Sequence, residues 1–290
     1  MSSESSQSLS KTTKNILNQY GIKLNKNLGQ NYLIDKNKRD QIINFGNINK
    51  NDTVLEIGTG IGTLTIELAK RAGKVIAIEQ DPNITKILSE RLEKEKIDNV
   101  ELINDDALNV EFPKFNKIIS NLPYQISSPI TFKFLNYDFD LAILMYQKEF
   151  AVRMNGTVGT KDYSRLSAML YFKCDVETLT DVSSESFIPK PKIDSTVVKL
   201  TPKENKISQD DFKIYSNFTQ ALFQHRNKKI RNALIDSRHV ICKLDKKEMK
   251  EKINSIESEE LNEYLKKRVI AIESEEILFL SKELNSILNE

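Results

Sequence analysis

Short apolar runs alternate with longer amphipathic stretches over the first half of the chain. Five of these runs, rich in Val, Ile and Leu, have the length of buried strands and lie at 53–57, 74–79, 100–107, 117–121 and 141–147. Spacers with helical periodicity separate them. This alternation predicts a parallel, doubly wound α/β sheet.

Beyond residue 147 the pattern changes. Apolar runs at 168–175 and 195–200 predict two further strands, whereas from Ser208 onward the apolar positions follow helical spacing. We therefore predict a disordered polar tail over 1–10, a Rossmann-like α/β domain over 11–203 and a smaller all-α domain over 204–290.

The composition is that of a globular protein, since 39% of the 290 residues are hydrophobic and 29% are charged. No apolar run approaches the ~20 residues that span a bilayer, and the Ser-rich N-terminus lacks the apolar core of a secretory signal. We expect a cytoplasmic protein that binds no membrane. Because the net charge is only +2, a basic surface for a partner must come from local clustering.

Cysteine and histidine residues are few and scattered. Cys174 and Cys242 form no C-x-x-C pair and make no ligand cluster with His225 and His239. We therefore expect no disulfide and no metal site, in a reducing compartment.

A glycine-rich turn follows the first predicted strand. Gly58, Gly60 and Gly62 have the spacing G-x-G-x-G, and a helix is predicted over 64–70. Glycines allow the backbone to approach a ligand at a helix N-terminus. The dinucleotide fingerprint would need its third glycine at the position of Thr63. A cofactor without a pyrophosphate, such as S-adenosylmethionine, fits this turn better.

Acidic residues end the next two strands. Glu79 stands 21 positions after Gly58, close to the spacing at which an acid binds ribose hydroxyls in such folds. Asp106, at the end of the third strand, is placed to accept a hydrogen bond from an adenine amino group. Because ligands bind outside the carboxyl ends of parallel strands, both acids are candidates for the cofactor site.

The fourth strand ends in Asn121-Leu122-Pro123-Tyr124, a sequence suited to methylation of an exocyclic amino group. The N6 nitrogen of adenine is a poor nucleophile because its lone pair is delocalised into the ring. The Asn121 side-chain oxygen and the Leu122 carbonyl can accept its two protons, and Pro123 restricts Leu122 to extended conformations. The Tyr124 ring can stack on the base. The alternative is a strand-to-turn junction with a packed tyrosine.

Three other segments have both a structural and a functional interpretation. The segment 27–35 is either a turn before a helix capped by Asp35 or a flap over a cofactor. Phe187 belongs either to the core or to a base sandwich opposite Tyr124. A basic cluster in the helical domain is a solvated face or, as we favour, a phosphate-binding surface. This basic cluster comprises Arg226, Lys228, Lys229 and Arg231, with helical spacing between Lys228 and Arg231.

Six motifs resemble those of the ribosomal RNA small-subunit adenine N6-dimethyltransferase family, and the match covers nearly the whole chain. The motifs are Leu28–Asn31, Glu56–Gly60, Asn121–Tyr124, Gln147–Glu149, Phe187–Ser195 and Gln224–Arg226. The stretch Gln125–Pro129 is similar to the archaeal and eukaryotic branch of that family.

The resemblance implies an S-adenosylmethionine-dependent enzyme that dimethylates N6 of two adjacent adenosines near the 3′ end of small-subunit rRNA. We expect a monomer that acts on a pre-ribosomal small subunit, with the counterpart of Phe187 against the target base. The expected catalytic residues are Asn121, Leu122, Pro123, Tyr124 and Phe187. The expected cofactor-binding residues are Asn31, Leu33, Gly58, Gly60, Glu79, Asp106, Ala107 and Asn121, and the expected RNA-binding residues are the basic cluster.

Other functions share parts of this pattern. The large-subunit rRNA methyltransferases of antibiotic resistance share the catalytic motifs, but Gln125 and the stretch Pro189–Ser195 favour the small-subunit enzyme. The intact Glu79, Asp106 and Asn121 argue against a non-catalytic ribosome-assembly factor on this fold. A DNA adenine methyltransferase is disfavoured because the all-α region does not suggest a sequence-reading domain.

Overall fold

A computed structural model describes residues 8–22, 31–204 and 207–289. Contacts divide the chain into unit 1, Met1–Ala151 with Val176–Pro202, and unit 2, Val152–Asp175 with Lys203–Glu290. The sequence places the boundary between 203 and 204 and assigns the segment 152–175 to the α/β domain. The contacts group this segment with the helices of unit 2 instead.

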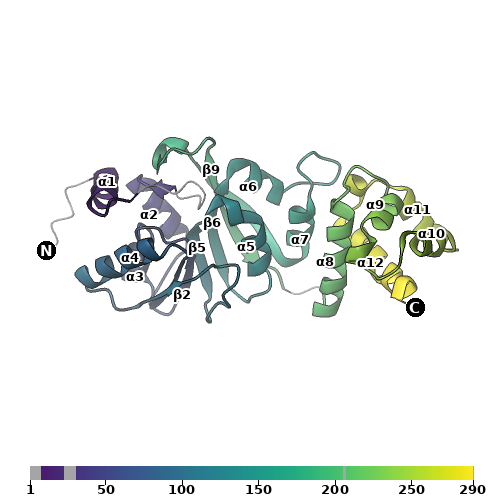
Figure 1. Cartoon of the computed structure of the whole chain (residues 1–290), viewed down its shortest axis with the longest axis horizontal. Helices are drawn as coiled ribbons and strands as arrows, with labels where there is room; N and C mark the ends of the chain where they lie inside the picture. Colours follow the sequence, from purple (N-terminus) through teal and green to yellow (C-terminus); the bar gives the residue numbers. More distant parts are fainter. Residues whose placement is uncertain (1–7, 23–30, 205–206, 290) are drawn as a thin grey trace. The chain divides into compact units, whose positions relative to one another are not determined.

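The described part of unit 1 contains a mixed sheet with the strand order β4-β3-β2-β5-β6-β9-β7 (Figure 1). Its strands are β2 (Thr53–Ile57), β3 (Lys74–Glu79), β4 (Val100–Asn104), β5 (Lys117–Asn121), β6 (Leu141–Gln147), β9 (Ser195–Pro202) and β7 (Cys174–Val182), whose first residues belong to unit 2. Strands β2 to β6 are parallel, and β9 is antiparallel to β6. The five strands predicted for the parallel sheet are confirmed, although β4 ends earlier than predicted.

Helices cover the sheet, as the burial of its central strands indicates. Strands β2, β3, β5 and β6 are buried at consecutive positions, so both of their faces are covered. The helices are α1 (Leu9–Gln19), α2 (Lys36–Phe45), α3 (Thr65–Arg71), α4 (Pro82–Lys94), α5 (Ser127–Phe134) and α6 (Lys148–Met154), the last of which ends in unit 2. A second, two-stranded sheet pairs β1 (Tyr32–Leu33) with β8 (Phe187–Ile188) in antiparallel fashion.

Helix α1 corrects the predicted tail. The Ser8 side chain accepts a hydrogen bond from the Lys11 backbone nitrogen at 3.3 Å and caps a helix that begins at Leu9. The disordered tail predicted over 1–10 is therefore wrong for residues 8–10, and residues 1–7 lie outside the described part of the chain.

Unit 2 consists mainly of helices that pack on one another (Figure 1). They are α7 (Arg165–Lys173), α8 (Gln209–Phe223), α9 (Ile230–Asp236), α10 (Lys246–Asn254), α11 (Glu259–Lys266) and α12 (Ser274–Asn289). None of the described helices is long and apolar enough to cross a membrane.

Helix α7 replaces most of the strand predicted over 168–175. The short apolar run suits a buried strand or a buried helix equally, so its neighbours decide. At the start of the helix the Ser167 hydroxyl accepts from the Ser164 nitrogen and donates to the Ser164 carbonyl, each at 2.9 Å, and the Tyr215 hydroxyl donates to the Ala168 carbonyl at 2.8 Å. The strand begins only at Cys174.

The strand order reverses between β2 and β5, and this point locates the site. The backbone ladder between the two strands joins Val54–Leu55 to Lys117–Ile118. Beyond it, the Ser120 hydroxyl donates to the Ile57 carbonyl at 2.6 Å and accepts from the Ile57 nitrogen at 3.2 Å. A crevice at the carboxyl ends of a parallel sheet, where the order reverses, is the usual ligand site of such folds.

Candidate active site

A cavity of about 170 Å³ lies at the carboxyl ends of β2, β3 and β5. Its lining comes from the segments 31–33, 56–60, 63–64, 78–80, 105–107 and 121–126. These segments include every described residue expected to bind the cofactor, and also Leu122, Pro123 and Tyr124. The structure therefore brings together side chains from five different chain segments that were identified separately in the sequence.

The glycine turn packs directly against two other parts of the lining. Gly58 and Gly60 have φ of +74° and +52°, a region that favours glycine. A Cβ on Gly58 would lie 2.8 Å from Pro123 Cγ, and one on Gly60 would lie 3.0 Å from Tyr32 Cε1. The absence of side chains at these two positions thus allows the turn, Tyr32 and Pro123 to share one wall of the cavity.

Glu79 is buried at the end of β3 and is held by backbone groups. Its Oε2 accepts from the Gly60 nitrogen and its Oε1 accepts from the Asp81 nitrogen, each at 3.0 Å. Burial raises the pKa of the Glu79 carboxyl, and these two N–H groups oppose the shift. The carboxylate is oriented at the cavity by the glycine turn itself.

Glu56, on β2, is the most deeply buried acid of the cavity at 1% exposure. Burial raises the pKa of its carboxyl to about 8, the Thr65 hydroxyl opposes the shift, and the charge of Glu79 adds to it. Neither Glu56 Oε2 nor Thr65 Oγ1 has a partner with hydrogen-bond geometry among the described residues. A buried carboxyl oxygen without a partner is costly unless a ligand satisfies it.

Tyr32 supplies a second hydrogen-bonding group without a partner. Its hydroxyl is buried at the cavity and lacks a hydrogen bond within the part of the chain that the structure describes. Burial and the charges of Glu79 and Asp81 raise the pKa of Tyr32. Tyr32 and Glu56 are site residues that were not predicted from the sequence, although Glu56 lies inside the motif Glu56–Gly60 and Tyr32 directly follows the motif Leu28–Asn31.

The charge of the lining indicates which cofactor fits. Four carboxyl groups line the cavity, and no Lys or Arg does so among the described residues; the acids are Glu56, Glu79, Asp105 and Asp106. Phosphate groups would meet only negative charge here, whereas a ligand with positive charge and hydrogen-bond donors would be favoured. These residues fit S-adenosylmethionine, which carries a sulfonium, an ammonium and ribose hydroxyls.

Asp106 begins a single helical turn after β4. Its Oδ1 accepts from the Leu108 nitrogen at 2.9 Å, and its carbonyl accepts from the Asn109 and Val110 nitrogens at 2.9 and 3.1 Å. Asp106 and the buried Ala107 line the cavity at the start of this turn.

The Asn121 amide is oriented by a contact with the first lining segment. Its Nδ2 donates to the Asn31 carbonyl at 3.1 Å. A flipped amide would place two acceptors together, so Oδ1 is the atom that points away from Asn31. Oδ1 accepts no hydrogen bond from the described residues. Residues 28–30 of the motif Leu28–Asn31 lie outside the described part of the chain.

Tyr124 lies in a short 3₁₀ helix (Tyr124–Ile126) directly after Pro123, which is extended with ψ of 123°. The hydroxyls of Tyr124 and the buried Ser195 lie 2.6 Å apart, which fixes the ring at the cavity. Burial raises the pKa of Tyr124, so this hydroxyl stays neutral.

Phe187 does not lie at the cavity, in contrast to its expected place against the target base. Its ring is 2% exposed and belongs to the core of unit 1, and β8 pairs it with Leu33. The structure thus favours the core interpretation, because the ring packs in this core and is not part of the cavity lining.

Two members of the basic cluster of unit 2 already have partners within the protein. Lys228 Nζ lies 2.8 Å from Asp236, which also pairs with Lys246, and these two lysines lower the pKa of Asp236 to about 2. Arg231 bonds to Asn254. Because α9 begins at Ile230, the helical face predicted for Lys228 and Arg231 is wrong.

Backbone pairing adds a residue to this cluster. Lys229 forms an antiparallel bridge with Arg268, and the Ile230 nitrogen donates to the Lys267 carbonyl at 2.9 Å. Lys229 and Arg268 are both exposed. Sequence reasoning missed Arg268, since no local pattern connects it with a cluster so far away in the chain.

Known proteins resemble the chain over most of its length. Residues 21–256 match the family model described as ribosomal RNA adenine dimethylase. "Probable ribosomal RNA small subunit methyltransferase A" of Methanosphaera stadtmanae is 54% identical over 244 residues, which cover 84% of this chain and 89% of the relative.

Two solved structures resemble the whole chain as well. A dimethyladenosine transferase from Plasmodium falciparum has a TM-score of 0.73 at 32% identity, covering 88% of this chain and 98% of that chain. The 23S rRNA methyltransferase ErmE has a TM-score of 0.60 at 26% identity, covering 89% of this chain and 100% of that chain. The predicted fold class, a Rossmann-like methyltransferase sheet with a helical C-terminal part, is confirmed.

Replacing Glu56 by Gln should change the pH dependence of stability. The folded protein keeps this proton up to about pH 8, whereas the unfolded chain loses it near pH 4.5. The free energy of unfolding of the wild type therefore falls as pH rises through this window. The free energy of unfolding of Glu56→Gln minus that of the wild type should therefore increase by roughly 1–4 kcal/mol between pH 5 and pH 8.

Urea denaturation without cofactor at both pH values measures this difference. Glu257→Gln, at an exposed carboxylate, is the control and should follow the wild type. If the difference in free energy of unfolding between Glu56→Gln and the wild type is the same at both pH values, Glu56 is ionised in the folded protein at both.

Phe187→Leu should retain methylation, because the ring packs in the core and does not present a π-face to the cavity. We expect a stability cost of about 1 kcal/mol, as for other size-conserving apolar exchanges. Phe218→Leu, at an equally buried ring of unit 2 with 2% exposure, is the matched control. Turnover per folded molecule should be similar in both variants, and a selective loss of turnover in Phe187→Leu would restore the base-stacking role.

Proposed function

Because the chain belongs to the ribosomal RNA adenine dimethylase family, we propose that it dimethylates N6 of two adjacent adenosines in small-subunit rRNA. The family predicted from the motifs is confirmed. The chain is an rRNA methyltransferase, and its cofactor is S-adenosylmethionine. We assign the target to the loop near the 3′ end of the rRNA, within a pre-ribosomal small subunit in the cytoplasm.

The orientation of the Asn121 amide is the observation that carries this proposal. The bond from Nδ2 to the Asn31 carbonyl leaves Oδ1 as an acceptor at a cavity that also contains the glycine turn and Glu79. An acceptor fixed in this way can bind an N6 proton of adenine and favour the tetrahedral form of the nitrogen. The Leu122 carbonyl, in the same motif, provides the second acceptor.

Protein residues position the reacting nitrogen, so the transfer needs no nucleophilic side chain. S-Adenosylmethionine supplies an electrophilic methyl group when bound. Asn121 and Leu122 orient N6 and polarise its N–H bonds, and Tyr124 supports one face of the base. The proton then leaves to solvent. A base in a loop reaches the site at little cost, whereas a paired base must first leave its helix.

The identity of the modified rRNA tests the proposal. Purified protein should form N6,N6-dimethyladenosine at two adjacent positions on unmodified small subunits, as mapped by mass spectrometry of the rRNA. Large subunits incubated in parallel should stay unmodified. Modification of large-subunit rRNA would instead assign the activity of ErmE-like enzymes, and no modification of either would indicate an assembly factor.

Asn121→Ala should lower kcat by at least ~10²-fold, the scale of losing one fixed transition-state hydrogen bond. S-Adenosylmethionine affinity should change little, since the lost acceptor is assigned to the target base. Asn136→Ala, at an exposed asparagine of the same unit, is the control and should behave as wild type. Near-normal turnover by Asn121→Ala, measured by methyl incorporation, would contradict the assigned role.

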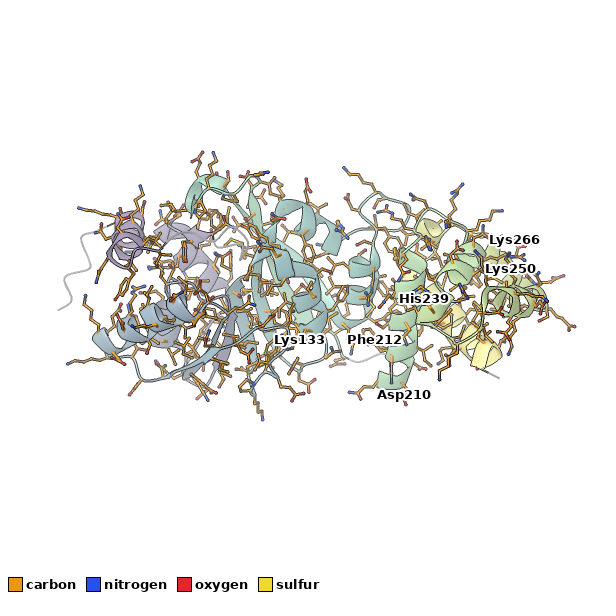
Figure 2. The ribbon with its side chains drawn as sticks, viewed as in Figure 1. Lys133, Asp210, Phe212, His239, Lys250 and Lys266 are labelled. Atoms are coloured by element: carbon orange, nitrogen blue, oxygen red, sulfur yellow. The ribbon has the colours of Figure 1, made fainter. Side chains whose placement is uncertain are left out.

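Unit 2 provides the proposed RNA-binding cations, which are Arg226, Lys229 and Arg268. Replacing all three by Gln should flatten the salt dependence of RNA binding. The slope of log K against log salt should decrease in magnitude by up to ~0.7–0.9 for each phosphate that the variant no longer binds. Lys228→Gln should have a smaller effect, because an ion pair already neutralises that lysine. The control is Lys250→Gln, at another exposed lysine of unit 2 (Figure 2). Equal slopes of log K against log salt for all variants would show that the cluster is a solvated face.

A further inference from the structure

Lys133 lies on α5 (Figure 2), and its ammonium contacts the segment that follows β4. Its Nζ lies 2.8 Å from the Ala107 carbonyl, 3.2 Å from the Leu108 carbonyl and 2.5 Å from the Val110 carbonyl. It also lies 4.3 Å from the ring centroid of Phe112. One side chain thus contacts most of the segment 107–112, from a helix that comes after the next strand in the chain.

These carbonyls belong to the helical turn that Asp106 begins. The turn ends at Val110, so the carbonyls after Asp106 have no further N–H groups along the helix to accept from. An ammonium at the end of such a turn satisfies them and interacts favourably with the aligned peptide dipoles. Asp106 Oδ1 caps the start of the turn, and Lys133 caps its end.

The cation is placed there without a carboxylate partner. Lys133 forms no ion pair among the described residues, and burial lowers its pKa while the more distant charges of Asp106 and Glu111 oppose the shift. In contrast, the buried Lys117 pairs with Asp52 at 2.9 Å. Because Lys133 loses solvation to bind backbone carbonyls and the ring of Phe112, its contribution lies in the conformation of this segment.

The turn and α5 belong to two halves of the site. Asp106 and Ala107 line the cavity on the side assigned to the adenine of the cofactor. Helix α5 begins directly after the segment Asn121–Ile126, which lines the acceptor side. Lys133 is therefore a direct connection between the cofactor half and the acceptor half of unit 1.

We propose that Lys133 is a positioning residue: its ammonium caps the Asp106–Val110 turn and thereby holds Asp106 and Ala107 in place for the cofactor. This role rests on the proposed function, because it requires that Asp106 binds S-adenosylmethionine. It does not require that Lys133 touches the cofactor or the RNA.

Lys133→Met tests the role, since the thioether keeps the apolar stem over Phe112 and removes the donors. We expect S-adenosylmethionine to bind about tenfold more weakly by calorimetry, the scale of a small displacement of binding groups. RNA affinity should be unchanged. Without cofactor, the amides of Asn109 and Val110 should exchange with deuterium about tenfold faster than in the wild type, as the turn opens more often.

Lys50→Met is the matched control. The Lys50 ammonium likewise bonds backbone carbonyls, those of Lys70 at 3.0 Å and Ala72 at 3.1 Å, at the end of α3 and away from the cavity lining. It should lower stability without changing cofactor affinity or exchange in the turn. Lys133→Arg retains a cation, so its affinity for S-adenosylmethionine should stay within about threefold of that of the wild type. If Lys133→Met does not fold, Lys133→Gln takes its place in every measurement.

A double variant separates this proposal from the proposed function. If Lys133 acts through Asp106, the double variant Asp106→Ala, Lys133→Met should bind the cofactor less than about threefold more weakly than Asp106→Ala alone. Unchanged affinity in Asp106→Ala would contradict the assigned cofactor site. Weak binding in Asp106→Ala together with wild-type affinity and exchange in Lys133→Met would overturn the positioning role alone.

Discussion

The junction of β2 and β5 at their carboxyl ends is the constraint on which the site depends. Their ladder stops at Leu55 and Ile118, and the Ser120 hydroxyl then holds the strands at a fixed separation through both polar groups of the Ile57 backbone. Just beyond, Pro123 occupies the space that a side chain at Gly58 would need. The glycine turn and the acceptor motif Asn121–Tyr124 are therefore packed against each other, so their relative positions are fixed.

The carboxyl groups of the cavity favour the binding of a positively charged ligand. Glu56 and Glu79 are buried there without a cationic partner among the described residues, and burial raises the pKa of both carboxyl groups, most clearly for Glu56. A cation placed beside them would favour their ionised forms and offset part of this cost. The same groups lower the stability of the protein without its cofactor at neutral and higher pH, a common exchange of stability for binding.

The strands β2, β3, β4 and β5 lead into the segments that line the cavity, and residues from other elements hold the binding groups in position. Glu79 is held by the amide of Gly60 and the ring of Tyr124 by the hydroxyl of Ser195. Lys133 has the same relation to the turn that carries Asp106. Residues that never contact the ligand thus determine where the ligand-binding groups lie, as expected where binding groups must be placed within a fraction of an ångström.

The sequence alone determined the parallel strands and the family, and it predicted the residues that lie at the strand ends, because apolar periodicity and motif spacing are local properties. The tertiary structure decided the rest. The run 168–173 became helical through the serines at its start and its packing partner, and Phe187 packs in the core of unit 1. Asp236 neutralises Lys228, and a backbone bridge brings Arg268 to the cluster. Burial and ion pairing depend on residues far away in the chain, so no local pattern specifies them.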